Sequence, residues 1–433
     1  MYLEKIYYKN VGPINEIDYT FKKDEQGNPI PLIIVGKNGS GKSILLSHIV
    51  DAFYELAAQE YNNVILHDVY NNLSYYKPIL SNQIKINEPY LISYLNFKYK
   101  ETNLEYIFKS GELSFDKYKE LRNSDWNNTW NNETFYKNTT KNKQIIKECF
   151  SNNVICFFGP NRYMKPSWLG EPYYHQDKVD YYSTQQRFNN HLYNPIVANN
   201  ITELTLQWLF DIITDSRIDT VTNIINTPTV ELFTKRINLL LTARRNAEEI
   251  MSKIIEEDIL FKMQTRGYSN LRFQLIRKND HKLLVSSLDA LSTGQLSLFH
   301  LFATIIRYAD NNSINFSYTL DQIQGIVVID EIELHLHTHL QAVILPNLIK
   351  LFPKIQFIIT SHSPLFLLGM KENFDNIEIL EMPTGRNIMV EEFADFKDAY
   401  QAIQHTEKYN NDIKEIIEAN SEKNLIITEG STD

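Results

Sequence analysis

Cysteine is scarce in this chain of 433 residues: there are only two, Cys149 and Cys156, and their spacing is not that of metal ligands. We interpret both as reduced, structural residues of a cytoplasmic protein. Long apolar runs are also missing, because the longest, such as 32–35 and 326–329, are far shorter than the roughly 20 residues that cross a bilayer. The first residues, MYLEKIYYKN, lack the apolar core of a signal peptide. We therefore expect a cytoplasmic protein with no membrane partner.

A surplus of positive charge is absent too, since the formal net charge is −10. This balance argues against a surface that binds nucleic acid everywhere, although a local basic patch stays compatible with it. Hydrophobic residues make up 43% of the chain, which is enough for one large or two ordinary domains with a proper core.

Strand-like and helix-like segments in the first part of the chain predict an α/β protein. Strands are expected at 1–8 and 31–35, NVGPINE between them is expected to be a loop, and an amphipathic helix should begin soon after Gly36. The alternating segments YLNFKYK and LEYIF predict antiparallel strands, and residues 125–140 predict a long surface loop. VICFFGPNRY predicts a buried strand that ends in a loop.

Apolar residues recur at helical spacing from 201 to about 261, which predicts a helical arm or lid. LRFQLIRKNDHKLLV predicts a hairpin. A helix at 294–308, the strand GIVVID, a helix at 340–351 and the strand IQFIIT follow. Continuous apolar strands separated by helices are typical of a parallel sheet covered on both faces.

The segment GKNGSGKS fits the pattern G-x-x-x-x-G-K-[ST] and lies between an apolar strand and an amphipathic helix, as a phosphate-binding loop must. Backbone N–H groups of such a loop surround phosphate oxygens, and the helix N-terminus adds positive potential. Lys42 would reach the terminal phosphates in a catalytic role, and the Ser43 hydroxyl would bind magnesium. The residues predicted to bind ATP here are Gly36, Asn38, Gly39, Ser40, Gly41, Lys42 and Ser43.

The strand GIVVIDE delivers two adjacent acids to the carboxyl edge of the sheet, where open α/β sheets bind ligands. Asp330 would bind magnesium directly or through its water, while Glu331 would orient or deprotonate the attacking water. The alternative for these acids is a simple helix N-cap.

Two further motifs resemble those of ATP-binding-cassette (ABC) ATPases. LSTGQ resembles the signature usually written Leu-Ser-Gly-Gly-Gln, and the resemblance implies that a second copy of the chain supplies Ser292, Thr293, Gly294 and Gln295 to the bound ATP. TSHSP resembles the switch-histidine loop, in which His362 hydrogen-bonds the γ-phosphate region. A serine-capped helix and an ordinary polar histidine are the alternatives.

The segment ELHLHTHL offers Glu333, His335, His337 and His339. Residues two apart on a helix do not face one another, so we do not expect tetrahedral metal binding there. The segment resembles an extension of the acidic strand in one ABC branch, often Asp-Glu-Pro-Glu-x-His-Leu-His-Pro. Ile332 and Thr338 replace the two prolines, which leaves the local backbone open.

Four other positions stay undecided from sequence. Arg162, at the end of FFGPNRY, has two interpretations: contact with phosphate or a pair with a surface acid. Tyr7, Tyr8 and Asn10 lie where related ATPases hold the nucleotide base, but core packing explains tyrosines equally well.

The four motifs follow one another along nearly the whole chain in the order phosphate loop, signature, acidic strand and switch histidine. In this order they resemble the non-transporter ABC ATPases, which include structural-maintenance-of-chromosomes (SMC) proteins and the OLD (overcoming lysogenization defect) family. OLD proteins carry a C-terminal Toprim nuclease domain whose first strand typically ends in Glu-Gly-x-x-Asp, and NLIITEGSTD resembles that strand. Glu429 would be the first acid of its metal site, with Asp433 as a neighbour. Toprim domains take further acids from an Asp-x-Asp strand, which this sequence lacks, so we expect the natural chain to continue; a simple polar end is the alternative.

The resemblance implies an ABC-type ATPase head with a parallel core sheet, an antiparallel β subdomain, an inserted helical arm and the start of a Toprim domain. The expected divisions are 1–200, 201–265, 266–398 and 399–433. ATP and Mg²⁺ would be the cofactors of a homodimer that gates a Toprim DNA nuclease in anti-phage defence. DNA is an expected partner, and a reverse transcriptase with its retron DNA is another. The alternative is a nucleotide-gated clamp or scaffold that binds DNA or protein and hydrolyses slowly; a transporter subunit is disfavoured by the arm and the Toprim-like end.

Overall fold

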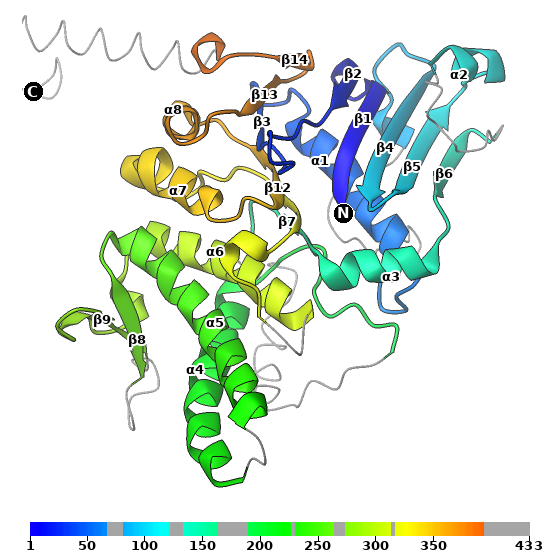
Figure 1. The fold of residues 1–433 in the computed structure, drawn as a ribbon. Helices are drawn as coiled ribbons and strands as arrows, with labels where there is room; N and C mark the ends of the chain where they lie inside the picture. The colour runs from blue at the N-terminus through cyan, green and yellow to red at the C-terminus, as the bar shows by residue number, and fades with distance from the viewer. Residues whose placement is uncertain are drawn as a thin grey trace, which may run out of the picture.

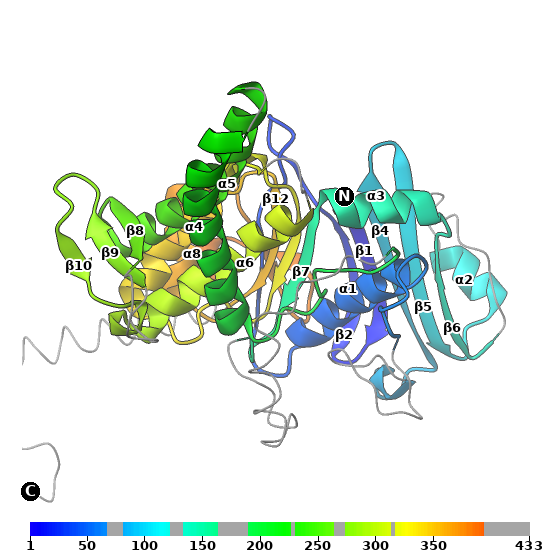
Figure 2. The ribbon, with the colours of Figure 1, turned by 90° about the horizontal axis from the view of Figure 1, so that it is seen from below.

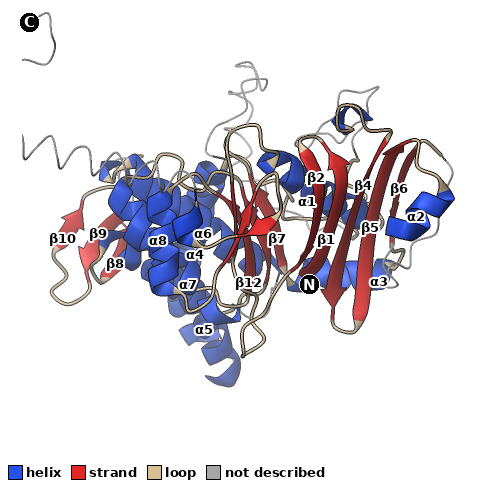
Figure 3. Cartoon of the chain, turned by 90° about the horizontal axis from the view of Figure 1, so that it is seen from above, coloured by secondary structure: helices blue, strands red, loops and turns tan. Residues whose placement is uncertain are grey.

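Three β-sheets and the helices packed on them make up the residues that the computed structural model describes, which are 1–66, 81–121, 133–162, 189–226, 230–263, 273–312 and 317–393. The sheets form three separate groups of strands along the molecule, with most helices between or beside them (Figure 3).

The central sheet carries the predicted phosphate loop and acidic strand. Its strand order is β14-β13-β3-β12-β11-β7, and neighbouring strands are parallel except β14, which pairs antiparallel with β13. The bounds are Leu32–Val35 (β3), Val154–Phe158 (β7), Gly325–Ile329 (β11), Ile355–Thr360 (β12), Glu378–Glu381 (β13) and Arg386–Asn387 (β14). Every residue of β3, β7, β11 and β12 is buried, which confirms the predicted parallel sheet covered on both faces.

Alternate residues of these strands feed two hydrophobic cores on opposite faces, as the two-residue period of a strand requires. Ile33 and Val327 lie in one core, whereas Ile34 and Val328 lie in the other. The first core is covered by α4 (Ile201–Asn226), α5 (Val230–Ile255), α6 (Thr293–Asn312), α7 (Leu345–Lys350) and α8 (Pro364–Asn373), and the second by α1 (Lys42–Ala57) and α3 (Lys143–Asn152) (Figure 1).

A five-stranded antiparallel sheet lies on the other side of α1, in the order β2-β1-β4-β5-β6 (Figure 2). Its bounds are Tyr2–Val11 (β1), Ile14–Thr20 (β2), Tyr90–Tyr99 (β4), Thr102–Gly111 (β5) and Phe135–Thr139 (β6), and the helix α2 spans Phe115–Leu121. The strands predicted from YLNFKYK and LEYIF are confirmed as parts of β4 and β5.

Two loop predictions in this region are wrong in part. Only Gly12 and Pro13 of NVGPINE lie between β1 and β2, and Ile14, Ile17 and Tyr19 of β2 are buried in the core. Residues 125–132 of the expected loop 125–140 lie outside the described residues, and its end is strand β6, which pairs antiparallel with β5. Its sequence FYKNT is polar, but Lys137 reaches the buried carboxylate of Asp51 on α1 at 2.8 Å, which stabilises a strand that its composition hides.

The helical arm is confirmed as the hairpin of α4 and α5, both of which contact α6 (Figures 1 and 2). The helix ends at Ile255, earlier than expected, because Glu256 adopts a left-handed conformation with φ +59°. Ser252 then accepts the N–H of Ile259 at 3.1 Å, where a strand begins. That strand belongs to a small antiparallel sheet, β10-β9-β8, with bounds Ile259–Met263 (β8), Phe273–Arg277 (β9) and Leu283–Val285 (β10), which confirms the predicted hairpin.

The helix predicted at 340–351 begins as a π-helix, η6 (Leu340–Ile344), and continues as α7. Helix α8 packs closely on this turn, since a Cβ on Gly369 would lie only 1.9 Å from the carbonyl oxygen of Ala342. Short 3₁₀ turns complete the order: η1 (Ser81–Gln83), η4 (Leu288–Ala290), η5 (Leu320–Gln322) and η7 (Val390–Glu392). Among the described helices, none is both long and apolar enough to cross a membrane.

Candidate nucleotide site

The predicted phosphate loop connects the end of β3 to the start of α1. Gly41 is the N-cap of α1 with φ +98°, a conformation that favours glycine, and no side chain of the described residues caps this helix. The first N–H groups of a helix lack partners within the helix, so this end suits an anion. A Cβ on Gly39 would have no atom within 4 Å, which shows that the tip of the loop is open.

Lys42 is buried at the base of the loop, as a lysine that serves the loop must be. Its Nζ donates to the carbonyl oxygens of Gly36 at 2.7 Å and Lys37 at 3.3 Å. The two carbonyl oxygens therefore hold the ammonium group of Lys42 inside the curve of the phosphate loop.

The acidic strand meets the phosphate loop directly. The hydroxyl of Ser43 donates to Oδ2 of Asp330 at 3.0 Å, and the hydroxyl of Thr360 donates to Oδ1 of the same carboxylate at 2.5 Å. Asp330 is 2% exposed. Ser43 and Asp330 offer two hard oxygen atoms at one place, which is the ligand chemistry that Mg²⁺ prefers, so the donor set fits this ion.

Glu331 lies at the same edge but is partly exposed, unlike its neighbour Asp330. Its backbone is left-handed, with φ +49°, and its N–H donates to the hydroxyl of Thr360 at 2.8 Å. Thr360 therefore contacts both acids through one oxygen atom. The motifs in the sequence give Thr360 no role in the site, and its place as the last residue of a buried strand is the signal that points to one.

Arg162 is fully buried, and its two interpretations, contact with phosphate or a pair with an acid, stay predictions. Its Nη1 donates to the carbonyl oxygens of Gly159 at 3.1 Å and Asp330 at 2.8 Å, and its Nη2 donates to those of Glu331 at 3.0 Å and Ile332 at 3.4 Å. The guanidinium is therefore bonded to the backbone of the acidic turn.

The predicted switch histidine follows β12 at the same edge. The N–H of His362 donates to Oε1 of Glu333 at 2.6 Å, and the N–H of Ser361 donates to the carbonyl oxygen of Ile34 in β3 at 3.1 Å. Ser363 caps α8 by accepting the N–H of Phe366 at 3.1 Å. The loop is thus fixed to the phosphate-loop strand on one side and to the acidic segment on the other.

The predicted signature forms the first turn of α6. Ser292 and Gln295 cap the helix reciprocally: the N–H of Gln295 donates to the hydroxyl of Ser292 at 3.3 Å, and the N–H of Ser292 donates to Oε1 of Gln295 at 3.0 Å. Ser292 and Thr293 are exposed. Gly294 is buried, and a Cβ there would lie 3.0 Å from the carbonyl oxygen of His335. The signature therefore packs on the segment that follows the acidic turn.

The histidines of the segment ELHLHTHL do not converge on one point. Its three histidines are exposed, and His339 Nε2 lies 3.0 Å from a carboxylate oxygen of Glu256. His335 is left-handed with φ +64°, so the segment is not a regular helix. In the described ranges, no three His, Cys, Asp or Glu residues gather as metal ligands would.

Tyr7 and Tyr8 are buried in the antiparallel sheet, which favours core packing over contact with a nucleotide base. The Tyr8 hydroxyl donates to the carbonyl oxygen of Leu45 at 3.4 Å, and the Tyr7 hydroxyl donates to Glu16 at 3.0 Å. Asn10 donates to Glu88 at 3.1 Å.

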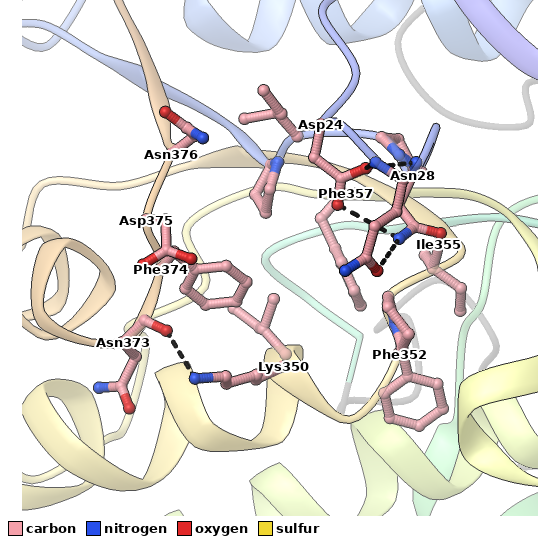
Figure 4. A pocket seen from close by; sticks show the side chains of 16 residues that line it. Asp24, Asn28, Lys350, Phe352, Ile355, Phe357, Asn373, Phe374, Asp375 and Asn376 are labelled. Atoms are coloured by element: carbon pink, nitrogen blue, oxygen red, sulfur yellow. Dashed lines mark hydrogen bonds between the residues drawn. The ribbon is translucent and has the colours of Figure 1, made fainter.

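Two hollows of the described surface lie elsewhere. One of about 210 Å³ lies at the amino edge of the central sheet, between the start of β3, the end of α7 and the segment after α8 (Figure 4). The other, of about 900 Å³, lies among α5, β8 and η6. Phosphate loops lie at the carboxyl edge of a parallel sheet, so the hollow in Figure 4 belongs to the opposite edge.

The comparisons with known proteins agree with these motifs. The sequence model of the family described as "AAA domain, putative AbiEii toxin, Type IV TA system" matches residues 32–368, a range that contains the phosphate loop, signature, acidic strand and switch histidine. The chain belongs to this AAA family. The OLD family, expected from the resemblance, is not the family matched, and Glu429 and Asp433 lie outside both the matched range and the described residues.

Several curated proteins are similar to parts of this chain. "Retron Ec83 probable ATPase" of Escherichia coli is 43% identical over 107 residues, which are 23% of this chain and 18% of that protein. "Septu protein PtuA" of Bacillus mycoides (strain KBAB4) is 41% identical over 85 residues, 20% of this chain and 11% of that protein. "Retron Vc95 probable ATPase" of Vibrio cholerae is 58% identical over 43 residues, 10% and 8% of the two chains. The matched segments therefore span less than two thirds of these relatives' own lengths.

Solved structures show a distant likeness in shape. The superposition on an SMC head bound to the C-terminal winged-helix domain of ScpA covers 90% of this chain and 97% of the SMC head, with a TM-score of 0.43 and 15% identity. The SMC head domain from Thermotoga maritima covers 90% and 99%, with a TM-score of 0.41 and 13% identity.

Proposed function

We propose that this AAA domain binds ATP with Mg²⁺ and hydrolyses it. The observation that carries the proposal is the 3.0 Å hydrogen bond between Ser43 and Asp330, which joins the phosphate loop to the acidic strand at one point of the sheet edge. Two motifs 287 residues apart in sequence thus share one site. Magnesium, when bound there with the nucleotide, would offset the negative charge of the phosphates.

The side chains divide the work of hydrolysis. Lys42 and the uncapped start of α1 would hold the terminal phosphates, and Ser43 with Asp330 would hold the metal, which would neutralise part of the phosphate charge. Glu331 takes the proton of the attacking water, because a partly exposed carboxylate beside the buried Asp330 is within reach of solvent. His362 donates a hydrogen bond to the γ-phosphate region.

Two copies of the chain close over two ATP molecules, with Ser292 and Gly294 of one copy completing the site of the other. The exposed Ser292 and Thr293 support this arrangement, since a helix N-terminus at the surface presents N–H groups to an anion from outside. Gln295 supports it as well, by fixing the Ser292 hydroxyl at this end of α6.

The biological role that we propose is a nucleotide-driven gate in anti-phage defence. The family match and the shared segments with proteins named for retron and Septu systems support this role. The gated activity would be a Toprim nuclease attached to the chain, with DNA as its substrate, and a reverse transcriptase with retron DNA is the defence partner that the two retron relatives suggest.

The variant Glu331→Gln tests the enzymatic core of this proposal. It should retain ATP in the presence of Mg²⁺ with an unchanged Kd and lose turnover by at least about 100-fold, because the water loses its base while the phosphate grip survives. Lys42→Ala is the matched control and should lose both binding and turnover. Binding is measured by equilibrium dialysis, and turnover by phosphate release.

Unchanged turnover in Glu331→Gln would remove the general base from this residue. Slow turnover in the unaltered protein, with tight DNA or protein binding that depends on ATP, would favour the clamp or scaffold instead. ATPase rates with and without DNA at a stated salt concentration separate the two functions, because DNA contacts weaken steeply as salt rises.

A further inference from the structure

The acidic turn after β11 is enclosed by two neighbouring strands. Strand β7 pairs with β11 on one side and β12 on the other, with Ile329 opposite Phe158 and Ile359. Arg162 follows β7, and Thr360 ends β12. Both side chains therefore approach the turn from opposite flanks.

The two side chains hold both backbone groups of Glu331. Thr360 accepts its N–H at 2.8 Å, and Arg162 donates to its carbonyl oxygen at 3.0 Å. Glu331 is left-handed with φ +49°, which is unfavourable for a residue with a side chain and persists only where the surroundings impose it. The conformation that aims this carboxylate is thus imposed from outside the turn.

Arginine is suited to this contact in a way that lysine is not. Its planar guanidinium carries five N–H donors, and here it reaches the consecutive carbonyl oxygens of Asp330, Glu331 and Ile332 as well as that of Gly159 in its own loop. A lysine ammonium is one point with three donors on a flexible stem. It cannot span three carbonyl groups along a turn in the same way.

We propose that Arg162 is a positioning residue for ATP hydrolysis, which fixes the left-handed turn that carries Glu331. The effect of Arg162 on hydrolysis rests on the proposed function, whereas its effect on the conformation of the turn rests on the four hydrogen bonds. Arg162 acts through the backbone and leaves the phosphate grip of Lys42 and Ser43 unchanged.

The test compares Arg162→Lys with Arg307→Lys in the full chain. Arg307 is a second buried arginine, on α6, and it has no role in the site described above. Arg162→Lys should lower kcat at least about 30-fold while KM and the Kd for ATP stay within about threefold. Arg307→Lys should leave kcat within about threefold, even if both variants lose thermal stability. Equal losses of kcat in both, or a parallel loss of ATP binding in Arg162→Lys, would overturn the positioning role.

A chemical rescue keeps the test decisive if lysine disturbs folding. Arg162→Ala leaves space for a guanidinium ion, and guanidinium chloride at concentrations well below denaturation should restore part of its turnover, whereas sodium chloride at the same ionic strength should not. Absence of rescue, in a variant that still binds ATP, would contradict the proposal.

Hydrogen exchange separates this proposal from the proposed function. In Arg162→Lys, amide exchange in the segment 330–336 should rise relative to the unaltered chain and to Arg307→Lys. If the unaltered protein proves unable to hydrolyse ATP but this exchange still rises, the proposed function fails, whereas the role of Arg162 in fixing the acidic turn stands. Unchanged exchange refutes that role of Arg162, whatever the ATPase result.

Discussion

Thr360→Val removes a hydroxyl that contacts both acids of the site. Valine has nearly the same shape, so the change removes an oxygen atom without opening a cavity. Thr360 is fully buried, and its hydroxyl donates to Asp330 at 2.5 Å and accepts from the N–H of Glu331 at 2.8 Å. Water cannot easily replace either bond at such a position.

The expected loss follows from these two bonds. A hydrogen bond to a charged carboxylate contributes about 1.5–3 kcal/mol, and a backbone N–H left unsatisfied in the interior costs about 1–3 kcal/mol. Allowing for partial relaxation, the free energy of unfolding should fall by about 2–4 kcal/mol. If about 1.4 kcal/mol of this loss also reaches the transition state of hydrolysis, kcat falls about tenfold.

Thr360→Ser is the matched control, because it keeps the hydroxyl and loses one buried methyl group, which costs about 1 kcal/mol. Urea unfolding of the nucleotide-free protein, followed by circular dichroism, measures stability, and phosphate release measures turnover. Equal stability and equal turnover in the valine and serine variants would refute the assignment of the hydroxyl as a link between the two acids.

Three further predictions address the core, the helix packing and the signature. Burial lowers the pKa of both His48 and His300 to about 4, below the value of 6.5 in an unfolded chain. Between these two pH values the unfolded state binds more protons than the folded state. The free energy of unfolding should therefore fall by about 3 kcal/mol per histidine as the pH drops from 6.5 to 4. Unfolding titrations of His300→Leu should show a smaller fall, while exposed His281→Gln should keep the full one. Gly369→Ala should lower stability by about 1–3 kcal/mol, because its Cβ would lie 1.9 Å from the Ala342 oxygen, whereas Lys371→Ala on the exposed side of α8 should change it by at most about 1 kcal/mol in the same assay. Ser292→Arg should bind ATP without turnover. Mixing it equally with Lys42→Ala chains should restore about a quarter of the phosphate release of the unaltered protein, because half of the dimers then contain one intact site out of two. No restoration would contradict a site shared between copies.

Much of the site could be predicted from sequence because its residues follow strands of a parallel sheet. GKNGSGKS, the acids after GIVVI and the histidine after IQFIIT each come directly after a continuous apolar run, and such runs bring their carboxyl ends to one edge. The 3.0 Å contact of Ser43 with Asp330 agrees with this reasoning.

The contacts that sequence could not predict run through the backbone or between distant segments. Arg162 binds carbonyl oxygens, which leave no mark in the sequence of the turn that they belong to. Strand β6 is polar and is stabilised by Lys137 and Asp51 across the fold, so its own composition favours a loop. Strand β2 is hard to predict for another reason: two polar residues separate Ile14 from Ile17, which breaks the alternation of INEIDYT, and Gly12 and Pro13 next to it are typical of a loop.

The hairpin of α4 and α5 contacts both the helix that begins with the signature and the backbone of Arg162. Each of its helices has 26 residues and is therefore about 39 Å long, and both contact α6, whose first turn is the signature. At its base, the N–H of Ile201 donates to the carbonyl oxygen of Arg162 at 3.4 Å, the residue whose side chain grips the acidic turn. In the dimer that we propose, a force applied to the outer end of this hairpin would therefore reach both the signature that caps one ATP and the turn that carries Glu331 beside the other.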